Sequence, residues 1–585
     1  MQEKIKDLLI FIYGLPRGEQ IYPKLLEILE QETGREIPGE GDACSPPSPF
    51  TASDVLLITY GDMLSPPGEG ATGESGLARL ARFLARWNRG AFTCLHLLPF
   101  HPYSSDDGFS VIDYREVDPR FGSWEDIREL GRHFKPVFDF VLNHGSVRSR
   151  WFQGFLAGEG EYGGWYITKP EDFDGSAVVR PRTHPLLTPF TKKDGSPVYV
   201  WTTFSADQVD YDFSNPGVLL EFIRIFLEYY RRGARIVRLD AIAYLWKEEG
   251  TSCIHHPKTH AVVRLLRAVI DHLGLDLRIL TETNVPHGEN IAYFGRGDEA
   301  HLVYNFALPP LTLHAAISGD AGPLRAWAGN LTVPPGGMFL NFLASHDGVG
   351  LTPVQGLVDK AAFAATIEEA KKRGALVSYK SGAEGPLPYE LNCSYVEVVA
   401  PAALGRNLPA GEAVKLRARA FLATQGVLLA LPGLPAIYFH SWIGSPAWRE
   451  GPALLGSNRA INREKPPLDR VETELGDPAS MRRQVYRGLS RLLEFRGSEG
   501  ALSPEVPHRI PEAAGPVFAV LRGPGPGGRW VLCMQNLGPE SALFTPQDPP
   551  VRSLGPLSLG PWETRWIALG GGGERRELST LEEPA

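Results

Sequence analysis

Four short apolar segments of the chain end in side chains that could carry out acid–base or nucleophilic chemistry. Carboxylate, imidazole and guanidinium groups are common agents of such reactions. One ending of this kind could simply cap a helix, whereas four in succession favour a catalytic site. The four endings are Asp139 to His144, Arg238 to Asp240, Glu282, and His346 with Asp347.

Two of the acidic residues have the surroundings of a nucleophile and an acid. Arg238 and Asp240 lie two positions apart, so in a strand both side chains share a face, where the guanidinium would keep the carboxylate ionised and oriented. Glu282 follows the apolar run LRIL, a drier setting that raises a carboxyl pKa, as protonation of a leaving oxygen requires. This division of roles is that of a glycoside-cleaving pair.

The segments that would position these residues alternate between short apolar runs and longer runs of helical period. From residue 54 the runs DVLLITYGD, CLHLLPFHP and KPVFDFVLNH are separated by GLARLARFLARWNRG and SWEDIRELGRHF. Such alternation indicates βα units around a parallel sheet, and the chain offers eight strands of this kind. The predicted fold is α/β, a (β/α)8 TIM barrel, whose catalytic groups would collect at the carboxyl ends of the strands.

The predicted barrel is interrupted twice and extended at both ends. The interruptions are predicted as inserted subdomains, because long excursions from a barrel usually form lids or binding elements. The predicted divisions are an N-terminal helical extension (1–50), the barrel (51–143, 215–347 and 401–497), the two insertions (144–214 and 348–400) and a C-terminal antiparallel β domain (498–585).

Composition narrows the class of protein. The chain has 585 residues, of which 43% are hydrophobic and 22% charged, and it lacks an apolar run long enough to cross a bilayer. A net charge of −9 without a basic stripe argues against nucleic acid as a partner. Five scattered cysteines, and a start that reads as an amphipathic helix rather than an export signal, predict a cytoplasmic location.

Four motifs resemble those of a known family, glycoside hydrolase family 13, the α-amylase family. Further segments make the chain similar to the sucrose phosphorylase subfamily within it, among them LLPFHPYSSDDGFSVIDY (97–114), RPRTHPLLTPF (180–190), PYELNCSY (388–395) and NRAINRE (458–464). The four family motifs are DFVLNH (139–144), ARIVRLDAI (234–242), ILTETN (279–284) and FLASHDG (342–348).

The resemblance implies a role for each of three carboxylates. Asp240 would be the nucleophile, Glu282 the general acid/base, and Asp347 a third carboxylate that grips the sugar hydroxyls. Other residues would surround a single glucosyl unit; for the aromatic ones, packing in the core is the alternative. By resemblance, the hydrogen-bonding groups are Asp106, His144, Arg238, His346 and Arg459, and the pocket lining is Phe109, Phe204, Gln208 and Tyr244.

The resemblance also implies an anion site, which would separate a phosphorylase from a hydrolase. Arg182, with Arg180 as the fallback, and Tyr389 fall where the similar enzymes hold phosphate, and Glu390 lies beside Tyr389 in the insertion expected near the acceptor. The alternative for Arg182 is a solvated loop residue. The implied activity is a retaining α-glucoside phosphorylase acting through a covalent intermediate on Asp240 and giving α-D-glucose 1-phosphate.

The acidic variants in SSDDGFSVIDY, SADQVDYD and PYELN look most like subfamily members that act on 2-O-α-glucosylglycerate. Sucrose, sucrose 6′-phosphate and glucosylglycerol remain alternatives, as do a family 13 hydrolase and a non-catalytic scaffold of the same fold.

No metal and no cofactor are expected, with inorganic phosphate as a co-substrate. Many α-amylases bind calcium partly through the asparagine of the first motif, here Asn143, but calcium needs six to eight oxygen ligands, and residues 145–215 offer no obvious acidic cluster. The expected partners are the glucoside and phosphate, without nucleic acid or membrane, and the expected assembly is a monomer or homodimer.

Overall fold

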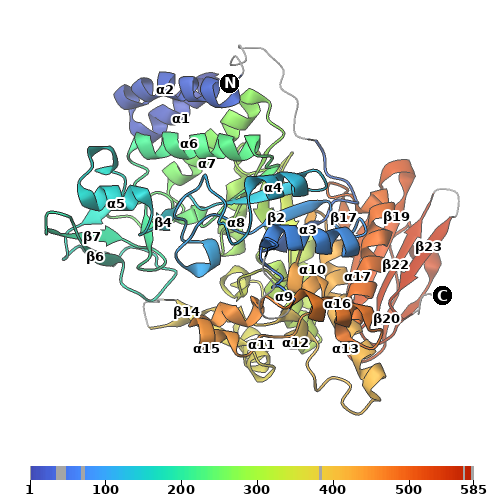
Figure 1. The fold of residues 1–585 in the computed structure, drawn as a ribbon. Helices are drawn as coiled ribbons and strands as arrows, with labels where there is room; N and C mark the ends of the chain where they lie inside the picture. Colours follow the sequence, from blue (N-terminus) through green and yellow to red (C-terminus); the bar gives the residue numbers. More distant parts are fainter. Residues whose placement is uncertain (1, 35–47, 68–72, 381–384, 571–573, 582–585) are drawn as a thin grey trace.

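Eight parallel strands close into a barrel, as predicted (Figure 1). The computed structural model describes residues 2–34, 48–67, 73–380, 385–570 and 574–581. Neighbouring strands follow the order β1, β16, β12, β11, β10, β9, β3 and β2. Their bounds are β1 Leu56–Thr59, β2 Cys94–Leu97, β3 Lys135–Phe140, β9 Ile236–Leu239, β10 Arg278–Thr281, β11 Leu302–Tyr304, β12 Met338–Asn341 and β16 Leu434–Tyr438.

Helices cover the barrel, and those that face solvent on one side present one apolar face to it. On α3, Leu77, Leu80, Phe83, Leu84 and Trp87 are all buried. Ser75 caps this helix by accepting from the Ala78 N–H, which satisfies one of its free amides. The longer helices around the barrel are α3 Gly76–Trp87, α4 Trp124–Gly131, α6 Pro216–Arg231, α7 Pro257–Leu273, α9 Leu308–Ser318, α10 Gly322–Gly329, α13 Ala410–Ala430 and α17 Met481–Ser498.

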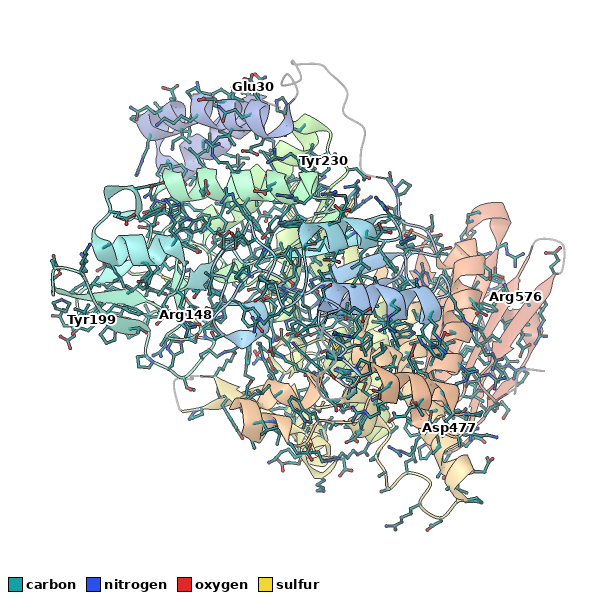
Figure 2. All side chains as sticks on the ribbon, viewed as in Figure 1. Glu30, Arg148, Tyr199, Tyr230, Asp477 and Arg576 are labelled. Atoms are coloured by element: carbon teal, nitrogen blue, oxygen red, sulfur yellow. The ribbon has the colours of Figure 1, made fainter. Side chains whose placement is uncertain are left out.

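The N-terminal residues form two helices, α1 Gln2–Tyr13 and α2 Leu15–Thr33. They pack on α7 and α6, on the outside of the barrel (Figure 1). Leu25 and Leu29 are buried, whereas Glu30 lies on the outer surface of α2 (Figure 2). Residues 35–47 of the predicted extension lie outside the described residues.

The two interruptions hold small sheets of their own. In 144–214, β4 His144–Ser146 pairs with β8 Gln208–Asp210, and β7 Pro197–Trp201 pairs with β5 Thr168–Lys169 and β6 Leu187–Thr191. In 348–400, β15 Leu387–Asn392 lies between β13 Val349–Gly350 and β14 Leu376–Lys380. Both insertions therefore place strands next to the strand ends that carry the candidate site residues.

The C-terminal residues form a five-stranded antiparallel sheet, as expected. Its strands are β17 His508–Arg509, β18 Val517–Arg522, β19 Trp530–Asn536, β22 Thr564–Leu569 and β23 Arg575–Ser579. Figure 1 shows this sheet beside α17, at the opposite end of the molecule from α5 Arg150–Ala157. None of the helices in the described ranges combines the length and apolarity that a membrane span needs.

Candidate active site

Asp240 lies at the carboxyl end of β9, held by a buried guanidinium. Arg238 Nη1 donates to Asp240 Oδ1 at 2.8 Å and also pairs with Asp139, its register partner on β3. His96 Nε2 lies 2.8 Å from the other Asp139 oxygen. Burial alone would raise the pKa of Asp139, but Arg238 and His96 outweigh it and lower the pKa to about 2. Asp139 is therefore a fixed negative charge beneath the site.

Glu282 lies at the end of the next strand, β10. Its Oε2 accepts the N–H of Ala241 at 3.0 Å. Ala241 follows Asp240 directly and has a left-handed backbone with φ of 49°, which an alanine adopts only at some cost in energy. The strained turn at Ala241 therefore holds the Glu282 carboxyl close to the backbone that follows Asp240.

Burial raises the pKa of both carboxyl groups. For Glu282 the pKa is about 7, because burial, together with the negative charges of Asp240 and Asp347, outweighs Arg238. The pKa of Asp240 is also raised, since burial outweighs its contact with Arg238. The sequence prediction for Asp240 was thus incomplete: pairing orients the carboxylate but does not lower its pKa below the usual value.

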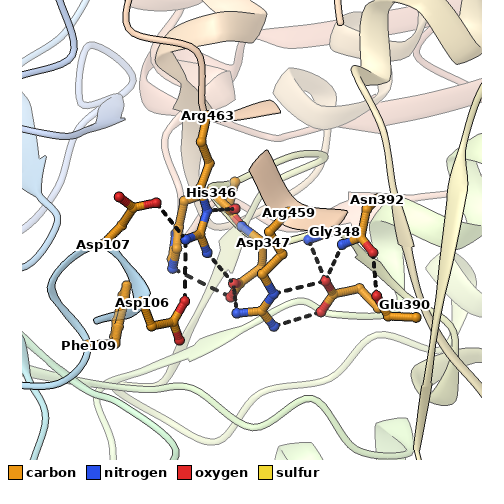
Figure 3. Close-up of polar contacts among 12 residues, drawn as sticks. Asp106, Asp107, Phe109, His346, Asp347, Gly348, Glu390, Asn392, Arg459 and Arg463 are labelled. Carbon is orange, nitrogen blue, oxygen red and sulfur yellow. Dashed lines mark hydrogen bonds and ion pairs between the residues drawn. The ribbon is translucent and has the colours of Figure 1, made fainter. Parts of the chain in front are cut away.

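Asp347, the third carboxylate, lies between two arginines (Figure 3). It pairs with Arg459, and its Oδ1 is 3.5 Å from Arg463 Nη2. Burial would raise the pKa of Asp347, but the two guanidinium groups lower it. Asp347 is consequently held as an anion.

A pocket opens over these carboxylates. Phe109 stacks on His346 with ring centroids 4.8 Å apart, and His144 Nε2 is 3.0 Å from the Phe109 carbonyl oxygen. The lining includes most of the predicted residues, the candidate aromatics among them. The lining residues predicted from the sequence are Asp106, Phe109, His144, Arg182, Phe204, Gln208, Asp240, Tyr244, Glu282, His346, Asp347, Tyr389 and Arg459.

Arg182 and Tyr389 come from different insertions and meet at this pocket. The Arg182 guanidinium carbon lies 5.6 Å from the centre of the Tyr389 ring and 5.9 Å from that of Phe204. Burial raises the pKa of Tyr389 to about 12, so its phenol is a neutral hydrogen-bond donor. Arg182 thus lies over aromatic rings at the pocket wall, whereas Arg180 does not line the pocket.

Comparison with known proteins connects this geometry to a family. Residues 90–325 match the alpha amylase catalytic domain. The chain is 47% identical to the glucosylglycerate phosphorylase of Spirochaeta thermophila over 92% of this chain and 89% of that protein. The chain belongs to the α-amylase family. The glucosylglycerate phosphorylase of Escherichia coli is 40% identical, over 97% of this chain and all of that protein.

A solved structure supports the fold of this family member. The sucrose 6F-phosphate phosphorylase from Thermoanaerobacter thermosaccharolyticum superposes with a TM-score of 0.74, covering 90% of this chain and 98% of that one at 24% identity. The likeness extends beyond the barrel to most of the chain.

Two predicted site residues of this α-amylase family chain lie behind the pocket wall. The sequence predicts that Arg238 binds the sugar; in the structure it is absent from the pocket lining and its Nη1 contacts Asp139 and Asp240, so the sugar contact stays a prediction. Glu390 was expected to face phosphate or acceptor. Its carboxylate instead accepts from Arg459, Nε at 3.1 Å and Nη2 at 2.8 Å.

Sequence reasoning missed Arg463 and several pocket-lining residues. Arg463 donates to the His346 carbonyl at 2.8 Å and to Asp107 at 3.0 Å, and it pairs with Asp106 (Figure 3). It lies in the segment NRAINRE, which drew attention only to Arg459. The lining residues that were missed are Ala241, Ala243, Thr283, Asn284 and Val285.

The asparagine that often binds calcium in the α-amylase family contacts an ammonium group here. Lys247 Nζ donates to Asn143 Oδ1 at 2.7 Å and pairs with Asp210 Oδ2 at 2.6 Å. Asp210 also accepts from Asn143 Nδ2 and from Thr203. The donor set does not fit calcium, because a cationic side chain already binds its two acceptors.

Proposed function

We propose that this chain is a retaining α-glucoside phosphorylase that gives α-D-glucose 1-phosphate. The observation that carries the proposal is the pocket itself, which joins the Asp240, Glu282 and Asp347 carboxyls to Arg182 and Tyr389. The carboxyl groups suit cleavage of a glycosidic bond with retention. The arginine and the phenol add positive charge and a neutral donor, which an attacking phosphate needs beside three acids.

The first half-reaction forms a glucosyl ester. Asp240 attacks the anomeric carbon while the bond to the leaving oxygen breaks, and the Glu282 carboxyl protonates that oxygen. With a pKa of about 7, Glu282 carries this proton near neutral pH. Arg238 keeps the attacking carboxylate in place through its 2.8 Å hydrogen bond.

The second half-reaction releases the ester to phosphate. A phosphate oxygen attacks the anomeric carbon, the bond to Asp240 breaks, and Glu282 takes up the proton carried by that phosphate oxygen, which restores its acid form. Two inversions give net retention. Bound phosphate outcompetes water because a positioned nucleophile has a high effective concentration.

We propose 2-O-α-glucosylglycerate as the glucoside. The support is the identity of 40–47% to three proteins named glucosylglycerate phosphorylase. Glycerate carries a carboxylate, and the guanidinium of Arg182 at the pocket fits such an anion.

The test supplies α-glucose 1-phosphate with glycerate, fructose, fructose 6-phosphate or glycerol and measures phosphate release. Release with glycerate well above that with the other three is expected. The highest rate with another acceptor would replace the substrate but keep the phosphorylase, and free glucose as the main product of glucoside cleavage at saturating phosphate would make the enzyme a hydrolase.

We further propose that the reaction needs no metal or organic cofactor. The Lys247 contacts with Asn143 and Asp210 support this for calcium. We also propose a cytoplasmic location. The free thiols of Cys94, Cys253, Cys393 and Cys533 suit a reducing compartment, and Cys44 lies outside the described residues.

A further inference from the structure

The guanidinium of Arg459 contacts two carboxylates from different parts of the chain, Glu390 and Asp347 (Figure 3). Glu390 binds one edge through two parallel contacts, to Nε at 3.1 Å and to Nη2 at 2.8 Å. The remaining nitrogen, Nη1, pairs with Asp347. A bidentate pair of this kind fixes the plane of a guanidinium as well as its position.

Glu390 is itself anchored to the strand end that carries Asp347. Its Oε1 accepts the Gly348 N–H at 3.1 Å and Asn392 Nδ2 at 2.5 Å. A side chain at Gly348 would come within 2.6 Å of the Glu390 Cγ, so only glycine permits this approach. The carboxylate is 2% exposed, and its lone pairs are used within the protein.

The contacts connect the inserted hairpin to the glucosyl pocket. Glu390 lies on β15, whose register places it opposite Gly350 of β13. On the same strand, Tyr389 lines the pocket, whereas Glu390 does not. Successive residues of a strand face opposite sides, which explains the difference.

We infer that Glu390 is a positioning residue, which orients Arg459 and through it Asp347 and so couples the 348–400 insertion to glucosyl binding. The inference rests on the proposed function. Without the charge of Glu390, Arg459 would be drawn to Asp347 alone, and the lone pairs of Asp347 would be less available to sugar hydroxyls. An acceptor role does not fit, because the Glu390 carboxylate is 2% exposed, does not line the pocket, and has both oxygens engaged within the protein.

The test is the isosteric change Glu390→Gln, made in the wild type and in Arg459→Ala. Steady-state kinetics with α-glucose 1-phosphate and either glycerate or glycerol would give kcat and KM for each substrate. For Glu390→Gln alone, kcat/KM for α-glucose 1-phosphate should fall about 10- to 100-fold relative to the wild type, the usual effect of a misplaced catalytic-site group. The preference between acceptors, measured as kcat/KM for glycerate divided by kcat/KM for glycerol, should change by less than about 2-fold, since Glu390 would not touch the acceptor.

In the Arg459→Ala background, the second change should not lower activity further, because Glu390 acts through the arginine that is already absent. Glu397→Gln is the matched control. Glu397 lies in the same insertion but outside the pocket lining, and it pairs at 2.7 Å with the exposed Arg449, so this variant should behave as wild type.

The outcomes are distinct. A folded Glu390→Gln variant with wild-type kinetics, an effect confined to the preference between acceptors, or a further tenfold loss in Arg459→Ala would overturn the inference alone. Circular dichroism and thermal melts establish folding. A wild type that shows no transfer between glucose 1-phosphate and any acceptor would overturn the proposed function and the inference with it.

Discussion

Replacing Glu282 by glutamine should stabilise the folded protein at alkaline pH while it removes the proposed acid. The wild-type carboxyl has a pKa of about 7, raised from 4.5 chiefly by burial. The difference of about 2.5 units corresponds to about 3 kcal/mol of destabilisation when the group is fully ionised. Glutamine keeps an oxygen for the Ala241 N–H and never ionises, so the variant avoids this penalty.

The pH dependence follows from which state holds the proton. Below about pH 4.5 the carboxyl is protonated in both folded and unfolded chains, and the variant gains nothing. Between about pH 4.5 and 7 the unfolded chain ionises first, so wild-type stability falls relative to the variant. Above about pH 7 the full difference is present.

Thermal melts at pH 5 and pH 8 measure this effect. With an unfolding entropy of about 2.1 cal/mol/K per residue over 585 residues, 3 kcal/mol raises Tm by about 2 to 3 °C at pH 8. The expected gain at pH 5 is below about 1 °C. Glu397→Gln, at a half-buried carboxylate outside the pocket, serves as the control. A gain equal at both pH values, or a loss at pH 8, would refute the reasoning.

Other changes test the remaining roles. Asp240→Asn should lower glucosyl transfer by about 10⁴-fold or more with the fold retained, because an amide forms no ester; near-normal turnover would remove its assignment as nucleophile. In the wild type, kcat/KM for donor cleavage should fall about tenfold per pH unit above about pH 7, as Glu282 loses its proton, and a flat profile to pH 9 would contradict this. Arg182→Ala should reduce phosphorolysis about 10- to 100-fold and raise the fraction of free glucose, measured by separate glucose and glucose 1-phosphate assays. Lys247→Met should destabilise the protein by about 3 to 5 kcal/mol in urea unfolding, because it leaves Asp210 buried without a cation; an unchanged midpoint would show that the pair adds little.

The barrel and the reactive carboxyls could be predicted because their signals are local. Each strand is short and apolar; Asp240 and Glu282 come directly after one, and Asp347 lies in the loop that follows β12, so their positions follow from the strands. The four motifs reinforced this. The correct placement of Arg182 and Tyr389 at one pocket came from the resemblance, since they are more than 200 residues apart in the sequence.

The ion-pair and hydrogen-bond partners of the site residues could not be predicted, because they depend on contacts between distant segments. Arg238 shares a motif with Asp240, but its commitment to Asp139 comes from the register of β3 against β9. Glu390 follows Tyr389 in sequence yet turns to Arg459, 69 positions away. Lys247 meets Asn143, 104 positions away, because the segments that follow the neighbouring strands β9 and β3 lie side by side.

The three carboxyls of the pocket differ most clearly in how many guanidinium groups contact them. Asp347 contacts two, Arg459 and Arg463, and its pKa is lowered. Asp240 contacts one, Arg238, and burial raises the pKa of Asp240 more than Arg238 lowers it. Glu282 makes no ion pair within the described part of the chain, and its pKa reaches about 7. Asp240 is buried and the other two are half-buried, and the number of guanidinium contacts decides where a proton stays: on Glu282, the one carboxyl that must deliver it to a leaving oxygen.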